Sequence, residues 1–331
     1  MKKENGTFSV VRHEEELALR PRGLNEFIGQ EEVVSHLKVY IQASLARKEP
    51  LDHVLFYGPP GLGKTTLAYI IAAEMGGNIR CLSGPTISRA GDLAALLTSI
   101  TEYDVVFIDE IHRLPRPCEE ILYSAMEEYT VYLLIGKGPG AKSVTLKLPP
   151  FTLVGATTRI SLLSAPLRNR FGIVEKLNFY TPQELSHIVD RTARLLGVGI
   201  SEKAALVVAS RSRGTPRLAN RLLRRVRDFA EVMGKQVIDE DLVEHAFSAL
   251  GVDAWGLSTI DRKFLSALAS HYRGGPVGLE SIAMVLGEDV DTLEEVYEPF
   301  LLTMGFIART KRGRVLTPCG YEYLKKVGEL E

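Results

Sequence analysis

One octapeptide constrains this chain more than any other feature, because it fits the phosphate-loop pattern G-x-x-x-x-G-K-[ST] at every defined position. It occupies residues 58–65, after an apolar run at residues 54–57 and before a helix-forming stretch that starts at residue 66. The motif requires this order of strand, loop and helix. Glycines let backbone N–H groups close around phosphate oxygens, and the new helix turns its positive end to the same anion. The chain is therefore expected to bind a nucleoside triphosphate, with Lys64 on the β- and γ-phosphates and the Thr65 hydroxyl on Mg²⁺.

Length and composition are those of an ordinary globular protein. Its 331 residues are 45% hydrophobic and 24% charged, which suits two or three domains. Apolar runs fall short of the roughly eighteen residues that cross a membrane. The N-terminus leads into charged sequence rather than a signal peptide, so a cytoplasmic protein is expected. Three cysteines without C-x-x-C spacing argue against a zinc site, and a net charge of −1 means that any nucleic-acid site must be found in local charge patterns.

The first half of the chain alternates apolar strands with helices. Four runs have the length and apolar character of buried strands: residues 54–57, 79–82, 104–110 and 151–156. Three helical stretches are expected beside them: residues 33–45, 92–100 and 118–128. Continuous apolar strands fit a parallel sheet that is buried on both faces. The predicted fold class is therefore α/β, with a doubly wound nucleotide-binding core.

The second half of the chain is predicted to be mainly helical. Four short helices are expected first, at residues 183–196, 202–211, 217–233 and 239–250, where Thr181 and Glu184 form a capping box. Helices at residues 261–272, 279–286 and 292–304 follow, and then two strand arms at residues 306–309 and 314–317. Three helices followed by a basic hairpin are typical of a winged helix. The predicted domains are residues 1–181, residues 182–253 as a helical lid, and residues 255–331 as a winged-helix DNA-binding domain.

Paired acids supply the second half of the chemistry that phosphate hydrolysis needs. Asp109 and Glu110 end a buried strand, at the edge where open α/β sheets bind ligands. We expect Asp109 to steady the Mg²⁺ shell and Glu110 to orient the attacking water. Thr158 ends the next strand and would touch the water or the γ-phosphate, with Thr157 as the alternative.

Two arginines are candidates for a charge that one subunit supplies to the next. Arg168 and Arg170 follow the last strand-like run of the core. An arginine supplied in this way is worth about 10³ to 10⁵ in rate. Surface charges without a role in hydrolysis are the alternative reading of this pair.

A hairpin is predicted at about residues 130–148. Two arms of β-type sequence flank the tip Gly-Lys-Gly-Pro-Gly, and the first arm is apolar on both faces. The hairpin could pack on the protein's own sheet. The alternative is a projecting hairpin whose apolar face is covered by a partner protein.

The predicted wing is basic, whereas the helix before it is acidic. Residues 280–298 carry seven acids and no base, among them Glu294, Glu295 and Glu298. Such a helix is not expected to read base edges. The wing gathers four cations suited to phosphate contact that is salt-sensitive and independent of sequence: Arg309, Lys311, Arg312 and Arg314. A solvated basic turn is the alternative, and the seven arginines of residues 211–227 fit a lid-helix face better than a second DNA site.

Taken together, four stretches resemble the AAA+ ATPases and, within them, the RuvB family of bacterial Holliday-junction branch-migration motors. They are residues 58–66, 107–114, 155–159 and 214–217. The resemblance extends from about residue 19 to residue 327. Residues 135–139 and 272–279 match stretches that other AAA+ proteins lack. The implied protein is an AAA+ P-loop NTPase with a lid and a winged-helix domain, which uses ATP to translocate DNA in recombination and repair.

The resemblance also implies roles for single residues. Thr158 matches the residue called sensor 1, Arg170 matches an arginine acting on the neighbouring subunit, and Arg217 matches the sensor-2 arginine of the lid. Arg309 and Arg314 match positions that contact DNA. The implied nucleotide-binding residues are Leu19, Arg20, Ile28, Gly61, Leu62, Gly63, Lys64, Thr65, Thr66, Glu127, Glu128, Tyr129, Tyr180, Pro216 and Arg217. Of these, residues 127–129 match a stretch that faces the neighbour's nucleotide, although the family more often has Asp in the middle.

Partners follow from the same resemblance. It implies ATP or ADP with Mg²⁺, double-stranded DNA at four-way junctions, and RuvA docked on the hairpin at residues 130–148. A homo-oligomeric ring, a hexamer in the family, and RuvC as a further partner are also implied. The rival function is a nucleotide-switched DNA loader or origin initiator of the same superfamily, in which ATP controls assembly. The acidic helix disfavours a transcription regulator.

Overall fold

The computed structural model describes residues 19–135 and 142–330 of the chain. The chain divides into two compact units. The first unit contains the chain up to Leu195 together with Thr215–Leu218, and the second contains Leu196–Gly214 and the chain from Ala219 onward. Within the described residues, every helix is too short or too polar to cross a membrane.

A five-stranded sheet in the order β2-β3-β6-β1-β7 is the centre of the first unit. All its pairings are parallel. The strands are β1 (Val54–Tyr57), β2 (Ile79–Ser83), β3 (Val105–Asp109), β6 (Thr152–Thr157) and β7 (Ile173–Lys176). All six residues of β6 and four of the five in β3 are buried, so the central strands are covered on both faces. The predicted parallel α/β core is confirmed.

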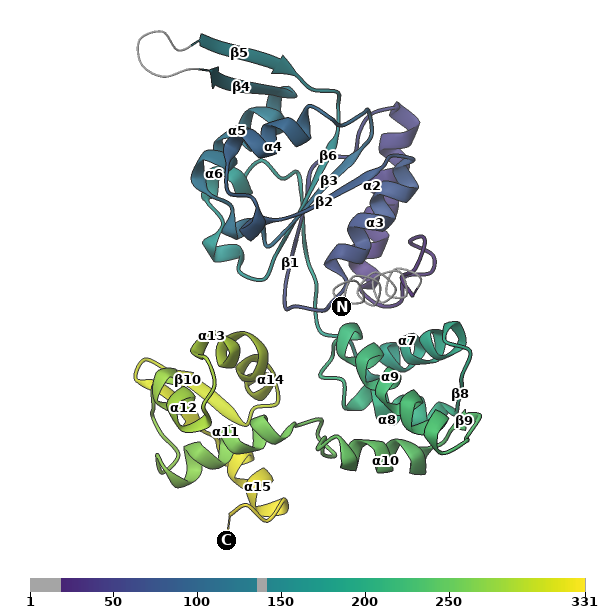
Figure 1. Ribbon diagram of the computed structural model, residues 1–331, viewed down its shortest axis with the longest axis vertical. Coiled ribbons are helices and arrows are strands. Elements are labelled where there is room, and N and C mark those ends of the chain that lie inside the picture. Colours follow the sequence, from purple (N-terminus) through teal and green to yellow (C-terminus); the bar gives the residue numbers. More distant parts are fainter. Residues whose placement is uncertain (1–18, 136–141, 331) are drawn as a thin grey trace, which may run out of the picture. The chain divides into compact units, whose positions relative to one another are not determined.

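Helices cover both faces of this sheet (Figure 1). On one face lie α2 (Glu31–Arg47) and α3 (Lys64–Met75), and on the other lie α4 (Ala90–Leu97), α5 (Arg116–Glu128) and α6 (Ala165–Arg168). Leucine, isoleucine and alanine side chains of α4 and α5 form one buried cluster with β3 and β6. After β7, α7 (Pro182–Leu195) completes the unit. Its predicted capping box is present, since Glu184 accepts the Thr181 N–H at 2.7 Å and Thr181 Oγ1 accepts the Glu184 N–H at 3.2 Å.

The hairpin forms a separate two-stranded antiparallel sheet of β4 (Thr130–Ile135) and β5 (Lys142–Lys147). Its base is attached to the core, because Val131 and Leu148 are buried in the cluster under α5. In the described part of the chain, its ladder does not join the five-stranded sheet. The predicted tip, residues 136–141, lies outside the described residues.

The lid segment in the second unit consists of β8 (Gly199–Ile200), α8 (Glu202–Ser210), α9 (Pro216–Val232), β9 (Val237–Ile238) and α10 (Glu240–Ala249). Side chains cap two of these helices: Ser201 accepts the Ala204 N–H before α8, and Asp239 accepts the Leu242 N–H before α10. Each such cap is worth about 1 kcal/mol. On α9 the buried side chains are aliphatic, so the basic run falls largely on the outer face of a lid helix.

The winged-helix segment consists of α11 (Thr259–Ser270), α12 (Leu279–Leu286), α13 (Val290–Thr292), a π-helical turn (Leu293–Tyr297), α14 (Glu298–Thr303), β10 (Ile307–Thr310), β11 (Gly313–Leu316) and α15 (Pro318–Lys326). One expectation is wrong in detail, because the helix expected at residues 292–304 is not a uniform α-helix. Pro299 has no N–H to donate one turn back to Glu295, which gives the preceding turn a reason to widen.

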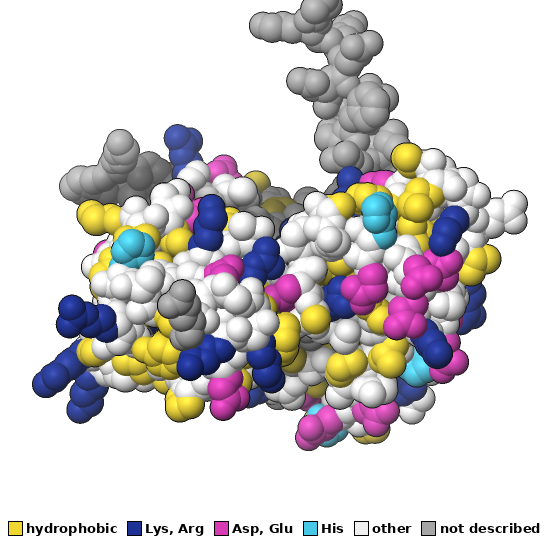
Figure 2. Space-filling view, turned by 90° about the horizontal axis from the view of Figure 1, so that it is seen from below, with side chains coloured by type: hydrophobic (Ala, Val, Ile, Leu, Met, Phe, Trp, Pro, Cys, Tyr) yellow, Lys and Arg dark blue, Asp and Glu magenta, His cyan; other side chains and the backbone are white. Residues whose placement is uncertain are grey.

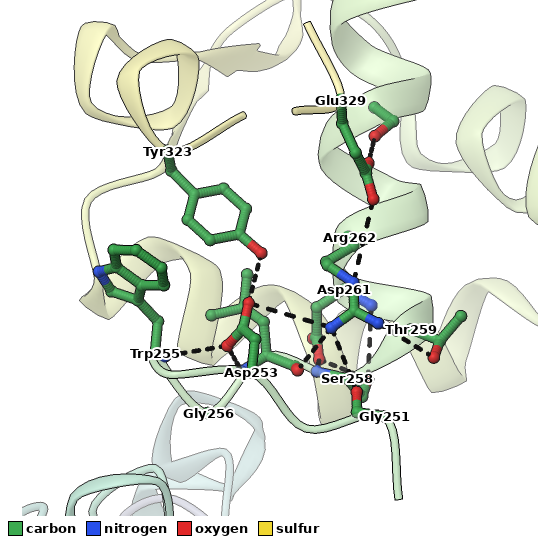
Figure 3. Close-up of polar contacts among 12 residues, drawn as sticks. Gly251, Asp253, Trp255, Gly256, Ser258, Thr259, Asp261, Arg262, Tyr323 and Glu329 are labelled. Carbon is green, nitrogen blue, oxygen red and sulfur yellow. Dashed lines mark hydrogen bonds and ion pairs between the residues drawn. The ribbon is translucent and has the colours of Figure 1, made fainter. Parts of the chain in front are cut away.

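A polar network joins the lid segment to the winged-helix segment (Figure 3). The Asp253 carboxylate accepts the N–H groups of Trp255 and Leu257 at 2.9 and 2.8 Å, and the Tyr323 hydroxyl at 2.5 Å. Arg262 donates to the carbonyl oxygens of Gly251 and Leu257 at 3.2 and 3.3 Å. The segment around residues 251–258 is therefore a hydrogen-bonded joint rather than a free linker.

Candidate functional site

The phosphate loop connects β1 to the first turn of α3. Gly63 precedes α3 with φ 103°, a backbone conformation that only glycine adopts without strain. It offers no side-chain cap, so the first turn of this helix keeps N–H donors that suit phosphate oxygens. Gly61 lies close to Arg217, since a Cβ atom at this position would be 3.0 Å from the Cβ of Arg217. The loop is thus shaped around its backbone donors.

Lys64 is folded back onto this loop. Its ammonium donates to the carbonyl oxygens of Gly58 and Pro59 at 2.7 and 2.8 Å, and the residue is 7% exposed. Burial lowers the pKa of Lys64, while the charges of Glu110 and Asp109 act in the opposite sense. Neutral carbonyls compensate a buried ammonium poorly, which gives a phosphate anion a strong electrostatic reason to bind here.

The paired acids lie at the carboxyl end of β3. Asp109 is the last residue of the strand, and Glu110 follows with φ 47°. Burial raises the pKa of Asp109 and the charge of Glu110 adds to it, whereas the Glu110 N–H, Lys64 and Arg217 act against it. A half-buried carboxylate of this kind gains most from a nearby cation. Together with the Thr65 hydroxyl it offers the oxygen donors that Mg²⁺ accepts alongside phosphates and water.

The structure distinguishes the two threonines at the end of β6. Thr157 is fully buried, with its Oγ1 2.9 Å from Nδ1 of His112 and accepting the Arg159 N–H at 3.0 Å. Thr158 instead donates to Oε2 of Glu110 at 3.2 Å. Only Thr158 therefore contacts the carboxylate predicted to orient water.

His112 was missed at the sequence level. Its Nδ1 lies 3.3 Å from Glu110 Oε2 as well as near Thr157, so the buried imidazole connects the acid to β6. The available signal was its position two residues after the paired acids, in the same tight turn.

Four of the implied nucleotide-binding residues lie outside the loop and α3: Leu19, Arg20, Ile28 and Tyr180. The Tyr180 hydroxyl donates to the Leu62 carbonyl at 3.2 Å, and burial raises the pKa of this tyrosine. The Arg20 guanidinium lies 4.7 Å from the centre of the Tyr69 ring on α3. Its Nη1 is buried without a hydrogen-bond partner among residues 19–135 and 142–330, which suits a bound anion. Leu19 is buried, with its carbonyl accepting from Arg191, and Ile28 is half-buried.

Of the site residues predicted at the start of α9, Arg217 contacts the loop, and Thr215–Leu218 belong to the same compact unit as the loop. Arg217 stands in the first turn of α9, next to Pro216, and its N–H donates to the Gly61 carbonyl at 3.3 Å. The structure thus brings Arg217 together with the phosphate loop.

Arg170 packs beside α5. Its guanidinium lies 4.5 Å from the centre of the Tyr123 ring and donates to the Pro166 carbonyl at 2.8 Å and to Glu127 at 3.1 Å. Its Nε is buried with no partner in the described chain. Arg168, the alternative, is exposed. The structure therefore groups Arg170 with Glu127, which the resemblance also places at a neighbour's nucleotide.

The other two residues of that stretch have partners within the chain. Glu128 accepts the Tyr132 hydroxyl of the hairpin at 2.8 Å. The Tyr129 ring lies against His53 and Phe151 in the core.

The wing presents its four cations unequally. Lys311 and Arg312 are exposed in the turn between β10 and β11, whereas Arg309 and Arg314 both hydrogen-bond to Glu298. Figure 2 shows the winged-helix segment at the left of the view, where Lys and Arg side chains predominate over acidic ones. One expectation needs correction: Glu298 does not present an acidic face to DNA, because it is fully buried.

These features define a class of protein: a P-loop ATPase core with a helical lid and a winged-helix segment. Models of three protein domains match successive parts of the chain. The Holliday junction DNA helicase RuvB P-loop domain matches residues 19–177, the RuvB AAA lid domain residues 180–253, and the RuvB C-terminal winged helix domain residues 254–325. The chain belongs to the RuvB family of AAA+ proteins, and the predicted resemblance is confirmed.

Individual relatives agree with this assignment. The chain is 55% identical over 315 residues to the Holliday junction branch migration complex subunit RuvB of Lawsonia intracellularis, covering 95% of this chain and 92% of that protein. It is 58% identical over 309 residues to the Limosilactobacillus reuteri subunit of the same name, covering 93% and 91%. The solved structure of the Thermotoga maritima RuvB Holliday junction branch migration motor has a TM-score of 0.84 and 51% identity, covering 93% of this chain and 98% of that one. Membership implies nucleotide binding and ATP hydrolysis.

Proposed function

We propose that this chain is the ATP-driven motor subunit of a branch-migration complex, acting in the cytoplasm on double-stranded DNA at four-way junctions during recombination and repair. One observation carries the proposal. A phosphate loop, two acids and a threonine lie at the carboxyl ends of three neighbouring strands, in a chain that also has a winged helix with exposed cations. The relatives named as branch migration complex subunits support the choice of substrate.

Hydrolysis would proceed as follows. Lys64 would leave its carbonyl partners for the β- and γ-phosphate oxygens. Thr65 and Asp109 would hold Mg²⁺, which would supply positive charge beside the same phosphates. Glu110 orients the attacking water. Thr158 holds Glu110 in place and meets the γ-phosphate, a role favoured by its contact with Glu110. The chemistry is mainly positioning and electrostatic stabilisation.

Recognition of the nucleotide would use both sides of the loop. Leu19, Arg20, Ile28 and Tyr180 would enclose the base, and Arg20 would also supply its unused Nη1 to a phosphate. Backbone N–H groups of residues 61–66 would bind the phosphates. Arg217, with Pro216 beside it, would carry contact with the γ-phosphate into the lid.

A second subunit would complete each site. The Nε of Arg170 is buried and has no hydrogen-bond partner among the described residues, which supports a role at the neighbour's γ-phosphate. Glu127, Glu128 and Tyr129 would line the same interface. A closed ring, a hexamer in this family, satisfies every site in this way.

Three contacts outside the ring complete the proposal. Arg309, Lys311, Arg312 and Arg314 would contact DNA phosphates. RuvA would dock on the hairpin of β4 and β5, whose ladder is separate from the main sheet. RuvC would join the same complex at the junction.

The proposal is tested by strand displacement on synthetic four-way junctions, with and without RuvA. We expect displacement that requires ATP and Mg²⁺, increases with RuvA and is indifferent to the sequence of the arms. A loader or initiator would bind the junction in an ATP-dependent manner without displacing strands, and that outcome would refute the motor.

A further inference from the structure

One carboxylate, that of Glu298, binds an arginine side chain from each strand of the wing. The Glu298 side chain is 0% exposed. Its Oε1 accepts from Nε of Arg309 and Nε of Arg314, each at 2.8 Å. Its Oε2 accepts from Nη2 of the same arginines at 2.7 and 3.0 Å. Both guanidinium groups are therefore held by the same two-pronged contact.

The strands bring the arginines to this position. Arg309 on β10 and Arg314 on β11 are direct partners in the antiparallel ladder. Two cations on adjacent strands repel each other unless an anion lies between them. Glu298 supplies that anion from the first residue of α14, so this contact links the helix to both strands of the wing.

The contact with Glu298 uses one hydrogen-bonding edge of each guanidinium group. Nε and Nη2 bind Glu298, and in both arginines Nη1 lies outside these hydrogen bonds. Arg309 is 49% exposed and Arg314 is 19% exposed, so the two side chains still reach the surface. Glu298 and the two guanidinium groups together carry one net positive charge, and Glu294 lies 3.6 Å from Nη2 of Arg309.

We infer that Glu298 is a positioning residue for DNA binding, which fixes Arg309 and Arg314 so that their free Nη1 groups are presented to the phosphate backbone. This inference rests on the proposed DNA-binding role of the wing. A free arginine side chain loses rotamer freedom when it binds a ligand, whereas one already held in place loses less. The negative charge of Glu298 lowers the net positive charge of the wing by one unit, and in exchange both arginines are held in a fixed geometry.

Two interpretations of Glu298 predict opposite changes in DNA affinity when its negative charge is removed. If the wing attracted DNA only through its total charge, removing this carboxylate would make the wing more positive and tighten binding. If Glu298 positions the arginines, removing its charge loosens both of them and weakens binding. The direction of the change decides between the readings.

The test measures the affinity of the full-length protein for a fluorescent random-sequence DNA duplex over a series of salt concentrations. For Glu298→Gln we expect about tenfold weaker binding, since two charge-assisted contacts to phosphate lose their geometry. Asp291→Asn is the matched control, because it removes one exposed negative charge from the same helical stretch. It should leave the affinity unchanged or slightly raised. Unchanged or tighter binding by Glu298→Gln would overturn the inference.

A double-mutant comparison separates positioning from other effects. In a protein with Arg309→Gln and Arg314→Gln, adding Glu298→Gln should cause no further loss of affinity. A further loss of the same size would show that Glu298 acts elsewhere. If Glu298→Gln does not fold, Arg309→Lys with Arg314→Lys takes its place, because lysine keeps the charge without the two-pronged geometry. Binding equal to the unsubstituted protein would then contradict the inference.

Exposed cations at the wing tip test the underlying role. Lys311→Ala with Arg312→Ala should weaken binding and reduce the salt dependence by about two units of slope, one for each phosphate contact. If this variant binds DNA normally, the proposed function of the wing fails. If it weakens binding while Glu298→Gln does not, only the inference about Glu298 fails.

Discussion

The protein holds in opposite ways the two sets of cations that we propose to bind phosphate. Lys64 is buried against neutral carbonyl oxygens, and burial lowers its pKa. The wing arginines Arg309 and Arg314 share a buried carboxylate and remain partly exposed. In the first case the positive charge is poorly compensated until a phosphate arrives. In the second, a large part of it is compensated in advance.

This difference fits two different ligands. A nucleotide is a compact anion that must be bound tightly and aligned to within a fraction of an ångström for hydrolysis. A motor on DNA has to release each phosphate before it meets the next, so weaker contacts with fixed geometry are an advantage. The comparison therefore predicts large effects for changes in the core and small ones in the wing.

The largest effect is expected from Lys64→Ala. It removes the ammonium that we propose to bind the β- and γ-phosphates, and we expect ATP hydrolysis to fall by about 10³ or more, together with loss of nucleotide binding. Phosphate release and binding of a fluorescent ATP analogue measure the two effects. Lys203→Ala, which removes an exposed lysine from the lid helix α8, is the control and should behave like the unsubstituted protein. A hydrolysis rate within tenfold of that of the unsubstituted protein would contradict the proposed difference between the core and the wing.

Arg170→Ala should follow. The variant is expected to bind ATP but to hydrolyse it about 10³-fold more slowly, because the arginine acts on the neighbour's γ-phosphate. Arg168→Ala removes the exposed arginine of the same segment and should have little effect. Mixing Arg170→Ala with Glu110→Gln subunits should restore part of the activity. Some sites would then combine an intact Glu110 from one subunit with an intact Arg170 from its neighbour. Normal turnover by Arg170→Ala alone would rule out the shared site.

The two threonines at the end of β6 should differ in what they disturb. Thr158→Val removes the contact with Glu110, and hydrolysis should fall by about ten- to a hundredfold with little change in melting temperature. Thr157→Val removes the buried contact with His112 and the hydrogen bond from the Arg159 N–H, and should cost about 1 to 3 kcal/mol of stability. Steady-state hydrolysis and thermal unfolding of the same two proteins provide the check. If the effects were exchanged, the assignment of sensor 1 to Thr158 would be wrong.

Much of the nucleotide site could be predicted from the sequence, because its residues are tied to local patterns. Glycines, a lysine at fixed spacing and acids at a strand end each have a position set by the element that carries them. The role of Glu298 could not be predicted in this way. Its partners lie 11 and 16 residues further along the chain, and their contact depends on how the hairpin folds back on α14. Glu298 is one of seven acids within residues 280–298, and nothing in this stretch of sequence indicated that it would be buried.

Two further features differ in whether the local sequence could have predicted them. The π-helical turn at Leu293–Tyr297 could have been suspected from Pro299, because proline removes a donor from the helix ladder. The polar joint around Asp253 depends on the Tyr323 hydroxyl, 70 residues away, so no pattern near Asp253 announces it.

The smallest effect is expected on the free energy of unfolding when the pH is lowered. Burial by itself would raise the pKa of Glu298, but hydrogen bonds and charges from Arg309 and Arg314 outweigh it and hold the pKa below the usual value. The stability from this group is therefore present above the usual glutamate pKa and is lost as pH falls through the lowered value. Unfolding of the protein by urea at a series of acidic pH values should show this loss. Glu298→Gln should remove that part of the pH dependence, and an unchanged profile would contradict the pairing.

The central claim is that ATP hydrolysis drives continuous movement along DNA rather than a single switch in assembly. Four-way junctions with homologous arms of increasing length test it most directly, with strand displacement and phosphate release followed in the same reaction. The account predicts that the time to displacement and the ATP consumed per junction both rise in proportion to arm length. A fixed burst of hydrolysis per binding event, independent of arm length, would contradict it.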